Sequence, residues 1–164
     1  MIGEMRDKET FEFALASAEV GRLVLATVHA KSVVQTFDRV LGFFPPEERS
    51  QILGHLAYNI SCFVCQKILL GKDGKSLVPV FEIMVGNYTT RQLAREKEFE
   101  KLAQVLRNGA NEGMQTFDQA IYKYWKDEVI STEEALKSCE RPQEMENKMK
   151  GISIGGSQGK ILGG

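Results

Sequence analysis

Ile2-Gly3-Glu4-Met5-Arg6-Asp7-Lys8-Glu9-Thr10 places an acidic side chain directly after a short apolar segment. The apolar residues indicate the end of a strand, with the Glu4 carboxylate at its tip. A glutamate with an ordinary pKa of about 4.3 is ionised at neutral pH and is able to accept a hydrogen bond from a water nucleophile. The alternative is an exposed glutamate near a flexible terminus. Asp7 and Glu9 favour a helix start, because carboxylates stabilise the positive end of a helix.

A second apolar segment follows. Phe11–Glu19 is rich in helix formers, and Gly21 is expected to end that helix. Arg22–Val28 has the length and composition of a buried parallel strand. His29 comes directly after it, at the edge where open α/β sheets bind ligands. The alternative is a loop histidine whose hydrogen bonds are satisfied within the chain.

Composition indicates one globular domain and excludes several classes of protein. The chain has 164 residues, of which 43% are hydrophobic and 26% charged, enough for a buried core. Its 21 basic and 22 acidic residues leave a net charge of −1, so no overall field favours nucleic acid. No apolar run is long enough for a membrane span, and the N-terminus has no secretory-signal pattern. Three cysteines, an odd number, fit a reducing cytoplasm.

The rest of the chain predicts two strands and several helices. We expect helices at 32–41, from 45 to about 64, and at 87–96, 99–106, 120–126 and 135–139, and strands at 67–70 and 77–85. Asp73-Gly74 predicts a hairpin turn between the strands. Asn87 or Thr89 is expected to cap the helix that ends at Glu96, and Thr116 and Ser131 begin capping boxes. Gly151–Gly164 contains six glycines and predicts disorder.

The cysteines do not predict a metal site. Cys62 and Cys65 fall in the helix expected to run to about residue 64, where they are interpreted as small core side chains. A structural zinc needs four ligands, and the spacing of Cys139, His29 and His55 does not provide the others.

Three segments resemble the type IV pilus retraction, or twitching motility, ATPases of the type II/IV secretion ATPase superfamily. Gly3–Thr10 resembles the Walker B motif, Leu25–Arg39 the histidine box, and Thr89–Glu96 a helical signature tied to force production. The resemblance spans roughly residues 2 to 139. It implies an α/β fold: residues 1–86 as the C-terminal part of a RecA-like P-loop NTPase domain with an incomplete sheet, 87–142 as a helical C-terminal subdomain, and 143–164 as a disordered tail.

The same resemblance implies roles for individual residues. Glu4 would be the catalytic acid that activates water, His29 the sensor of nucleotide state, and Arg39 a stabiliser of transition-state charge. The implied nucleotide-binding residues are Gly3, Glu4, Arg6 and His29. The alternative for Arg39 is a solvated helix residue paired with Asp38.

The force-production signature is only partly present. The chain keeps Arg91, Leu93, Arg95 and Glu96, and departs from the family pattern at Thr89, Thr90, Gln92 and Ala94. The departures weaken the implied force-transmission role. The alternative is an ordinary solvated helix face.

For the intact protein, the resemblance implies a hexameric cytoplasmic motor that uses Mg-ATP to retract pili. It would work at the inner membrane face through pilus platform proteins, without membrane insertion or nucleic acid. Gly155–Lys160 is not a Walker A motif, because Ile154 and Ile161 stand at the positions that the motif needs for Gly and for Ser or Thr. We therefore expect the chain to start within a motor domain and to be inactive alone, binding neither ATP nor Mg²⁺ tightly.

Two other functions stay open. One is a pilus-assembly or type II secretion ATPase, which often carries a four-cysteine insertion where this chain has Gly71–Gly74. The other is a non-catalytic module that docks on a full-length ATPase.

Overall fold

The computed structural model describes residues 1–152. The chain divides into two compact units: unit 1 is Met1–Ile68 with Pro79–Thr116, and unit 2 is Leu69–Val78 with the chain from Phe117 onward. The predicted division at residues 86 and 142 stays a prediction. Most of the predicted glycine-rich tail, from residue 153, lies outside the described residues.

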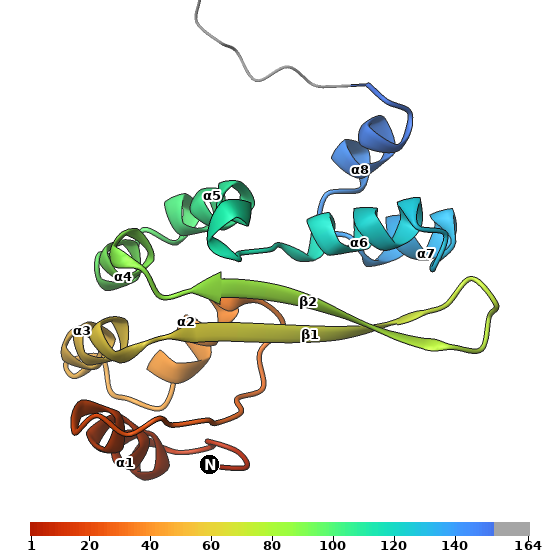
Figure 1. Cartoon of the computed structure of the whole chain (residues 1–164). Coiled ribbons are helices and arrows are strands. Elements are labelled where there is room, and N and C mark those ends of the chain that lie inside the picture. Colours follow the sequence, from red (N-terminus) through yellow and green to blue (C-terminus); the bar gives the residue numbers. More distant parts are fainter. Residues whose placement is uncertain (153–164) are drawn as a thin grey trace, which may run out of the picture. The chain divides into compact units, whose positions relative to one another are not determined.

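The described residues form short helices and one two-stranded hairpin (Figure 1). The helices are α1 (Lys8–Glu19), α2 (Val33–Leu41), α3 (Arg49–Asn59), α4 (Tyr88–Arg95), α5 (Phe99–Asn108), the 3₁₀ helix η1 (Ala110–Glu112), α6 (Phe117–Lys126), α7 (Thr132–Ser138) and α8 (Pro142–Met149). The strands are β1 (Cys62–Leu70) and β2 (Leu77–Val85).

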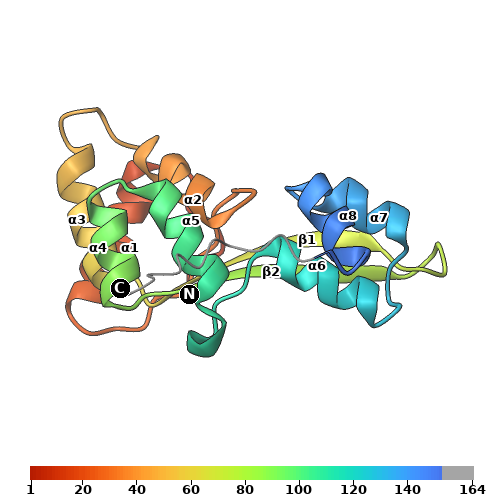
Figure 2. The same ribbon diagram turned by 90° about the horizontal axis from the view of Figure 1, so that it is seen from above.

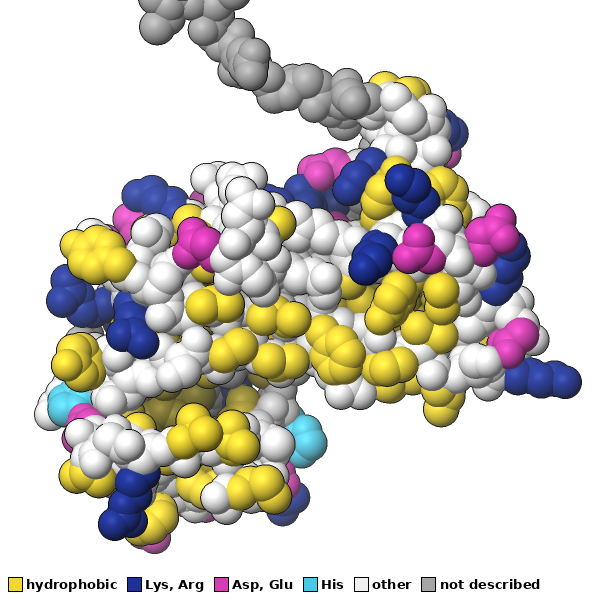
Figure 3. Space-filling view, viewed as in Figure 1, with side chains coloured by type: hydrophobic (Ala, Val, Ile, Leu, Met, Phe, Trp, Pro, Cys, Tyr) yellow, Lys and Arg dark blue, Asp and Glu magenta, His cyan; other side chains and the backbone are white. Residues whose placement is uncertain are grey.

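The hairpin has one buried and one exposed face. Its register follows from two backbone bonds, Gly71 N to Ser76 O and Gly86 N to Ser61 O, both 2.8 Å long. Successive side chains of a strand point to opposite faces. The buried positions are Cys65 and Leu69 on β1, and Val80, Glu82 and Met84 on β2. Hydrophobic side chains on the other face stay exposed along the hairpin, among them Val64 and Ile68 (Figure 3).

The core of unit 1 forms where α2 covers the buried face of the hairpin. Phe37 of α2 is fully buried, and its ring packs edge-on against Phe63 of β1 at 5.1 Å. The same ring stacks on Phe99 of α5 at 5.4 Å, so α2 and α5 lie side by side (Figure 2). Full burial of such a side chain stabilises the fold by about 2 kcal/mol. This packing fixes α2, and with it the loop that carries His29.

Unit 2 is a small helical cluster at the turn of the hairpin. Helices α6, α7 and α8 contact one another, and Phe117, Ile121, Ala135 and Met145 are buried between them. The backbone of Lys72 donates to the carbonyl of Val129 at 2.8 Å, which ties the hairpin turn to the loop after α6.

Several local predictions are confirmed. Strand β2 has the predicted bounds, and the Asp73 carboxylate accepts from the backbone N–H groups of Lys75 and Ser76 at the predicted turn. Gly74 there has φ +69°, which favours glycine. Asn87 caps α4 in a capping box with Thr90.

Ser131 caps α7 as predicted, but the capping box is only half used. The Ser131 hydroxyl accepts from the N–H of Glu134. The Glu134 carboxylate does not turn back to the cap, and instead accepts from the N–H of Leu70 at 3.2 Å.

The buried strand predicted at Arg22–Val28 is wrong. This segment makes one parallel bridge, Ala26 with Ile2, and Leu23 and Leu25 are 80% and 58% exposed. Its backbone pairing is with the short segment Ile2–Met5, which covers one edge and leaves the apolar side chains in solvent.

The helix predicted to run to about residue 64 ends earlier. Helix α3 stops at Asn59, because Ile60 adopts an extended conformation, and β1 begins at Cys62. The two cysteines therefore lie on a strand, Cys62 exposed and Cys65 buried. Short apolar runs do not distinguish helix from strand, and here aromatic and β-branched residues favour the strand.

The first residues of the segment predicted as a tail, 143–149, are helical. Pro142–Met149 forms α8, and Met145 is buried in unit 2. Proline at the first helical position and one inward apolar residue are enough to place this helix.

Candidate functional site

Backbone hydrogen bonds bring the two predicted catalytic segments together. The N–H of Ile2 donates to the carbonyl of Leu25 at 2.8 Å, and the N–H of Met5 to that of Thr27 at 2.9 Å. The Thr27 hydroxyl also donates to the carbonyl of Gly3. Glu4 is thereby held beside the end of the segment that leads to His29.

The Glu4 carboxylate contacts both polar side chains predicted to share its site. Its Oε1 lies 2.9 Å from His29 Nε2, and its Oε2 contacts Arg6 Nη2. The Glu4 side chain is 23% exposed, whereas those of Arg6 and His29 are 73% and 82% exposed. The imidazole and the guanidinium are thus open to a ligand from solvent.

The electrostatics favour an ionised Glu4. The hydrogen bond from Arg6 lowers the pKa of the Glu4 carboxyl, burial opposes this, and the charges of Arg6 and His29 lower it further. The same contact raises the pKa of Arg6. The group is therefore a hydrogen-bond acceptor at neutral pH, able to orient a water molecule and a poor proton donor.

Arg39 does not join this group. It lies in the last turn of α2, is exposed, and stacks over the Phe43 ring at 5.2 Å. Its guanidinium is thus held by its own helix end and not by Glu4 or His29.

The residues of the force-production signature are divided between interior and surface. Arg91 Nη2 donates to the carbonyl of Ile60 at 2.9 Å, at the junction of α3 and β1. Its Nε is buried with no hydrogen-bond partner among the described residues. Leu93 is half-buried, Arg95 is exposed, and Glu96 accepts from Gln92 at 3.1 Å. Arg91 therefore joins α4 to α3, while Arg95 stays free to meet another surface.

One buried acid was not among the predicted site residues. Glu82 of β2 is 5% exposed, and its Oε1 accepts from the backbone N–H of Val33 at 2.7 Å. The sequence could have indicated this residue, because Glu82 is an acidic residue at an inward-facing position of the predicted strand, between the apolar residues Val80 and Met84. This carboxylate holds the first residue of α2.

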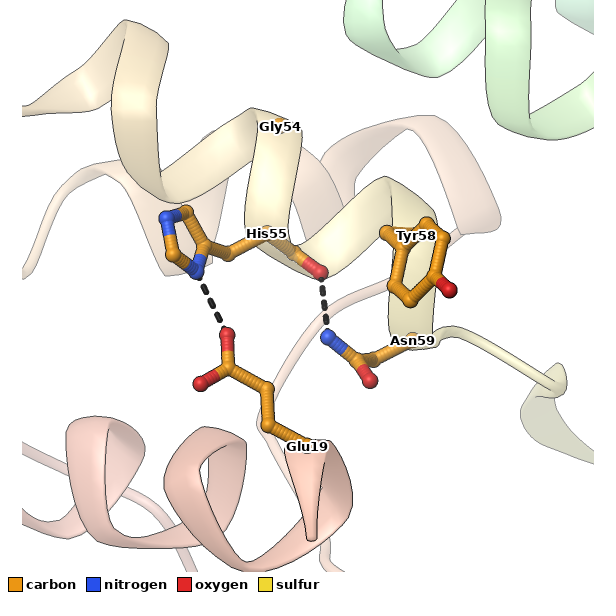
Figure 4. A pocket seen from close by; sticks show the side chains of 5 residues that line it. All are labelled: Glu19, Gly54, His55, Tyr58 and Asn59. Atoms are coloured by element: carbon orange, nitrogen blue, oxygen red, sulfur yellow. Dashed lines mark hydrogen bonds and ion pairs between the residues drawn. The ribbon is translucent and has the colours of Figure 1, made fainter. Parts of the chain in front are cut away.

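A second histidine–glutamate pair lies apart from the first. His55 Nδ1 of α3 is 2.5 Å from Glu19 Oε1 of α1, beside an open hollow of about 390 Å³ (Figure 4). Gly54, Tyr58 and Asn59 complete its lining. Both side chains of the pair are about half exposed, and the pair connects α1 to α3.

Residues 1–152 contain no group of three or more His, Cys, Asp or Glu side chains placed to hold a metal ion. Their helices include none long and apolar enough to cross a lipid bilayer.

The amino-acid sequence is similar to a protein family and to several known proteins. Residues 1–71 match the family described as Type II/IV secretion system protein. The type IV pilus ATPase PilU of Pseudomonas aeruginosa is 34% identical over 92% of this chain and 39% of its own length. A twitching motility protein of Neisseria gonorrhoeae is 33% identical over 88% of this chain and 39% of its own length.

Solved structures match as well. The pilus retraction motor PilT with bound ADP superposes with a TM-score of 0.77, at 31% identity, over 88% of this chain and 40% of that one. The ATPase DotB of Yersinia pseudotuberculosis gives 0.71 at 26% identity, over 82% and 35%. The chain thus spans about two fifths of the length of the curated relatives it matches.

The predicted α/β fold of this ATPase class is confirmed by these superpositions. Two separate kinds of comparison agree, since the sequence and the structural matches each cover most of the chain. The chain belongs to the type II/IV secretion ATPase family, and its homologues include the PilU and PilT twitching motility ATPases.

Proposed function

We propose that this chain supplies the catalytic glutamate and the sensor histidine of a motor ATPase that retracts type IV pili. The observation that carries the proposal is the 2.9 Å contact between Glu4 Oε1 and His29 Nε2, at the ends of two paired segments. Retraction is favoured over assembly or secretion by the extent of similarity. The retraction ATPase PilT of Pseudomonas aeruginosa matches over 87% of the chain, and the assembly ATPase PilB over 42%.

In this proposal Glu4 orients the water that attacks the terminal phosphate. An ionised carboxylate accepts a hydrogen bond from that water. This orients the water so that a lone pair on its oxygen faces the phosphorus. ATP, when bound, supplies the phosphoanhydride bond that is broken. The contact with Arg6 keeps Glu4 ionised, because it lowers the pKa of the carboxyl.

His29 would report the nucleotide state to the rest of the protein. Its imidazole is largely exposed and shares the Glu4 carboxylate with Arg6. A γ-phosphate oxygen would compete with Glu4 for the ring N–H, so hydrolysis would change the partner of His29. The other proposed nucleotide contacts are Gly3 and Arg6. The Gly3 carbonyl accepts a hydrogen bond from the Thr27 hydroxyl, and the Arg6 guanidinium is exposed.

The proposed site fits ATP better than it fits a metal held by protein alone. Arg6 and His29 offer exposed donors to an anion. Mg²⁺ binds proteins through one or two carboxylates plus substrate phosphates, so Glu4 is the carboxylate of this site that would help to hold it. Binding of the β- and γ-phosphates needs a loop of backbone N–H groups and a lysine, and no stretch of the 164 residues matches that motif. We therefore propose that the chain is inactive by itself.

The proposed assembly is a hexamer acting at the cytoplasmic face of the inner membrane through pilus platform proteins. Arg39 would then act from its place on α2 across a subunit boundary, because within the described residues it stacks on Phe43 and is not among the ion-pair partners of Glu4. Arg95 and Glu96, both exposed on α4, would transmit force to a neighbouring part.

The test is ATP turnover by a chimera in which this chain replaces the matching C-terminal part of Pseudomonas aeruginosa PilT. Glu4→Gln should lower kcat about 100-fold or more, because the amide no longer attracts the proton of the water. The matched control is Glu9→Gln, in the first turn of α1, which should leave turnover within twofold. A folded Glu4→Gln chimera that binds ATP and keeps full turnover would overturn the proposal.

A further inference from the structure

Glu82 is a charged side chain in the core of unit 1. Its β2 neighbours on the same face, Val80 and Met84, are fully buried, and Glu82 itself is 5% exposed. The hairpin register sets it opposite Cys65, whose thiol pKa is raised chiefly by burial and also by the Glu82 charge. A buried carboxylate is costly unless it is hydrogen-bonded, so its partners indicate what it does.

One partner of Glu82 is the first residue of a helix. Glu82 Oε1 accepts from the N–H of Val33, the first residue of α2, at 2.7 Å. The first N–H groups of a helix have no partner within the helix, and an anion there is further stabilised by the helix dipole. The usual cap of α2 is already present, since Ser32 Oγ accepts from the N–H of Gln35 at 3.3 Å. Glu82 therefore adds a tertiary bond from the hairpin to a helix that is capped locally.

The consequence concerns the loop before α2. On one side, Thr27 is held by the N–H of Met5 and by the carbonyl of Gly3. On the other side, Val33 is held by Glu82. His29 lies between these two fixed points, so both determine where its imidazole meets Glu4.

We propose that Glu82 is a positioning residue for His29, acting through the N-terminus of α2. It touches neither the nucleotide nor the water. It limits the positions available to the Val28–Ser32 loop and so keeps the imidazole at the Glu4 carboxylate. This rests on the proposed function for the role of His29, but the positioning itself is measurable without ATP.

The first test uses NMR of the full 164-residue chain, which has only two histidines, His29 and His55. Cross-relaxation between the His29 ring and the Glu4 side chain should be clear in the wild type and lost in Glu82→Leu, which has no acceptor. Glu82→Gln keeps an oxygen acceptor and should retain it. The ring signals of His55, in its own pair with Glu19, should not change in either variant.

Two further variants separate positioning from stability. Val33→Pro removes the donor N–H at the first helical position, which proline tolerates, and the extended Ser32 before it is compatible with proline. Val33→Pro should lose the His29–Glu4 cross-relaxation as Glu82→Leu does, and it replaces Glu82→Leu as the test if that variant does not fold. Val80→Ala creates a cavity on the same face of β2 and should lower the melting temperature while keeping the His29–Glu4 contact.

In the chimera, Glu82→Leu should lower kcat about 10-fold to 100-fold with KM nearly unchanged, as expected for a misplaced catalytic group. Glu82→Gln should restore most of it. Positioning is overturned if Val80→Ala loses the His29–Glu4 contact as fully as Glu82→Leu, or if Glu82→Leu and Val33→Pro both retain it. Failure of the Glu4→Gln experiment would overturn the function and leave this NMR result standing.

Discussion

Side chains of the same type in this protein have different roles because they contact different neighbours. Arg91 and Arg95 are one helical turn apart on α4, yet the first bonds the carbonyl of Ile60 and the second is exposed. Glu4 and Glu9 lie in one segment, yet only Glu4 is in contact with His29. Residue type alone would give both members of each pair the same role.

Arg91→Met should destabilise the chain by about 1 to 3 kcal/mol, because it removes a charged donor from a partly buried carbonyl. The measurement is urea unfolding of the purified chain. Arg95→Met is the matched control on the same helix and should change stability by no more than about 0.5 kcal/mol. Equal effects of the two changes would show that the Ile60 contact contributes little.

At the scale of elements, the hairpin turn has its own pH dependence. The hydroxyl of Ser76 and the N–H groups of Ser76 and Lys75 lower the pKa of Asp73 from 3.8 to about 2. A carboxyl whose folded pKa is depressed stabilises the fold above its unfolded pKa, and this stabilisation is lost as the pH falls through the folded value.

Comparison of the wild type with Asp73→Asn isolates this charge. The difference in Tm should be constant above about pH 5 and should shrink as the pH falls from about 4 toward 2, where about half of the Asp73 carboxyls in the folded state have taken up a proton. Thermal melts across this range measure it. A difference that stays unchanged down to pH 2 would mean that the carboxylate charge does not stabilise the turn.

At the scale of the whole molecule, nucleotide affinity should come mainly from a phosphate-binding loop that these 164 residues do not contain. Calorimetry should find no micromolar binding of ATP to the chain, whereas the PilT chimera should bind it. Micromolar affinity for the chain alone would contradict this, and would favour a stand-alone nucleotide-binding module.

Much of the local structure could be predicted from the amino-acid sequence. It specified β2, the turn at Asp73-Gly74 and the Asn87 cap, because each depends on side chains within a few residues of the backbone they bind. It also selected Glu4 and His29, through resemblance to a family. It misplaced the end of α3 and the start of β1, since the run around Cys62 and Phe63 satisfies either period.

Contacts between residues far apart in the chain could not be predicted from the sequence. The bond from Thr27 to Gly3 joins residues 24 apart, that from Arg91 to Ile60 residues 31 apart, and that from Val33 to Glu82 residues 49 apart. No local pattern encodes such contacts, because each depends on which segments pair or pack in the folded chain, and only the bond from Val33 to Glu82 joins α2 to the hairpin. Leu23 and Leu25, which an apolar run had indicated as buried, are exposed, since burial depends on the neighbours that a segment finds and not on its composition alone.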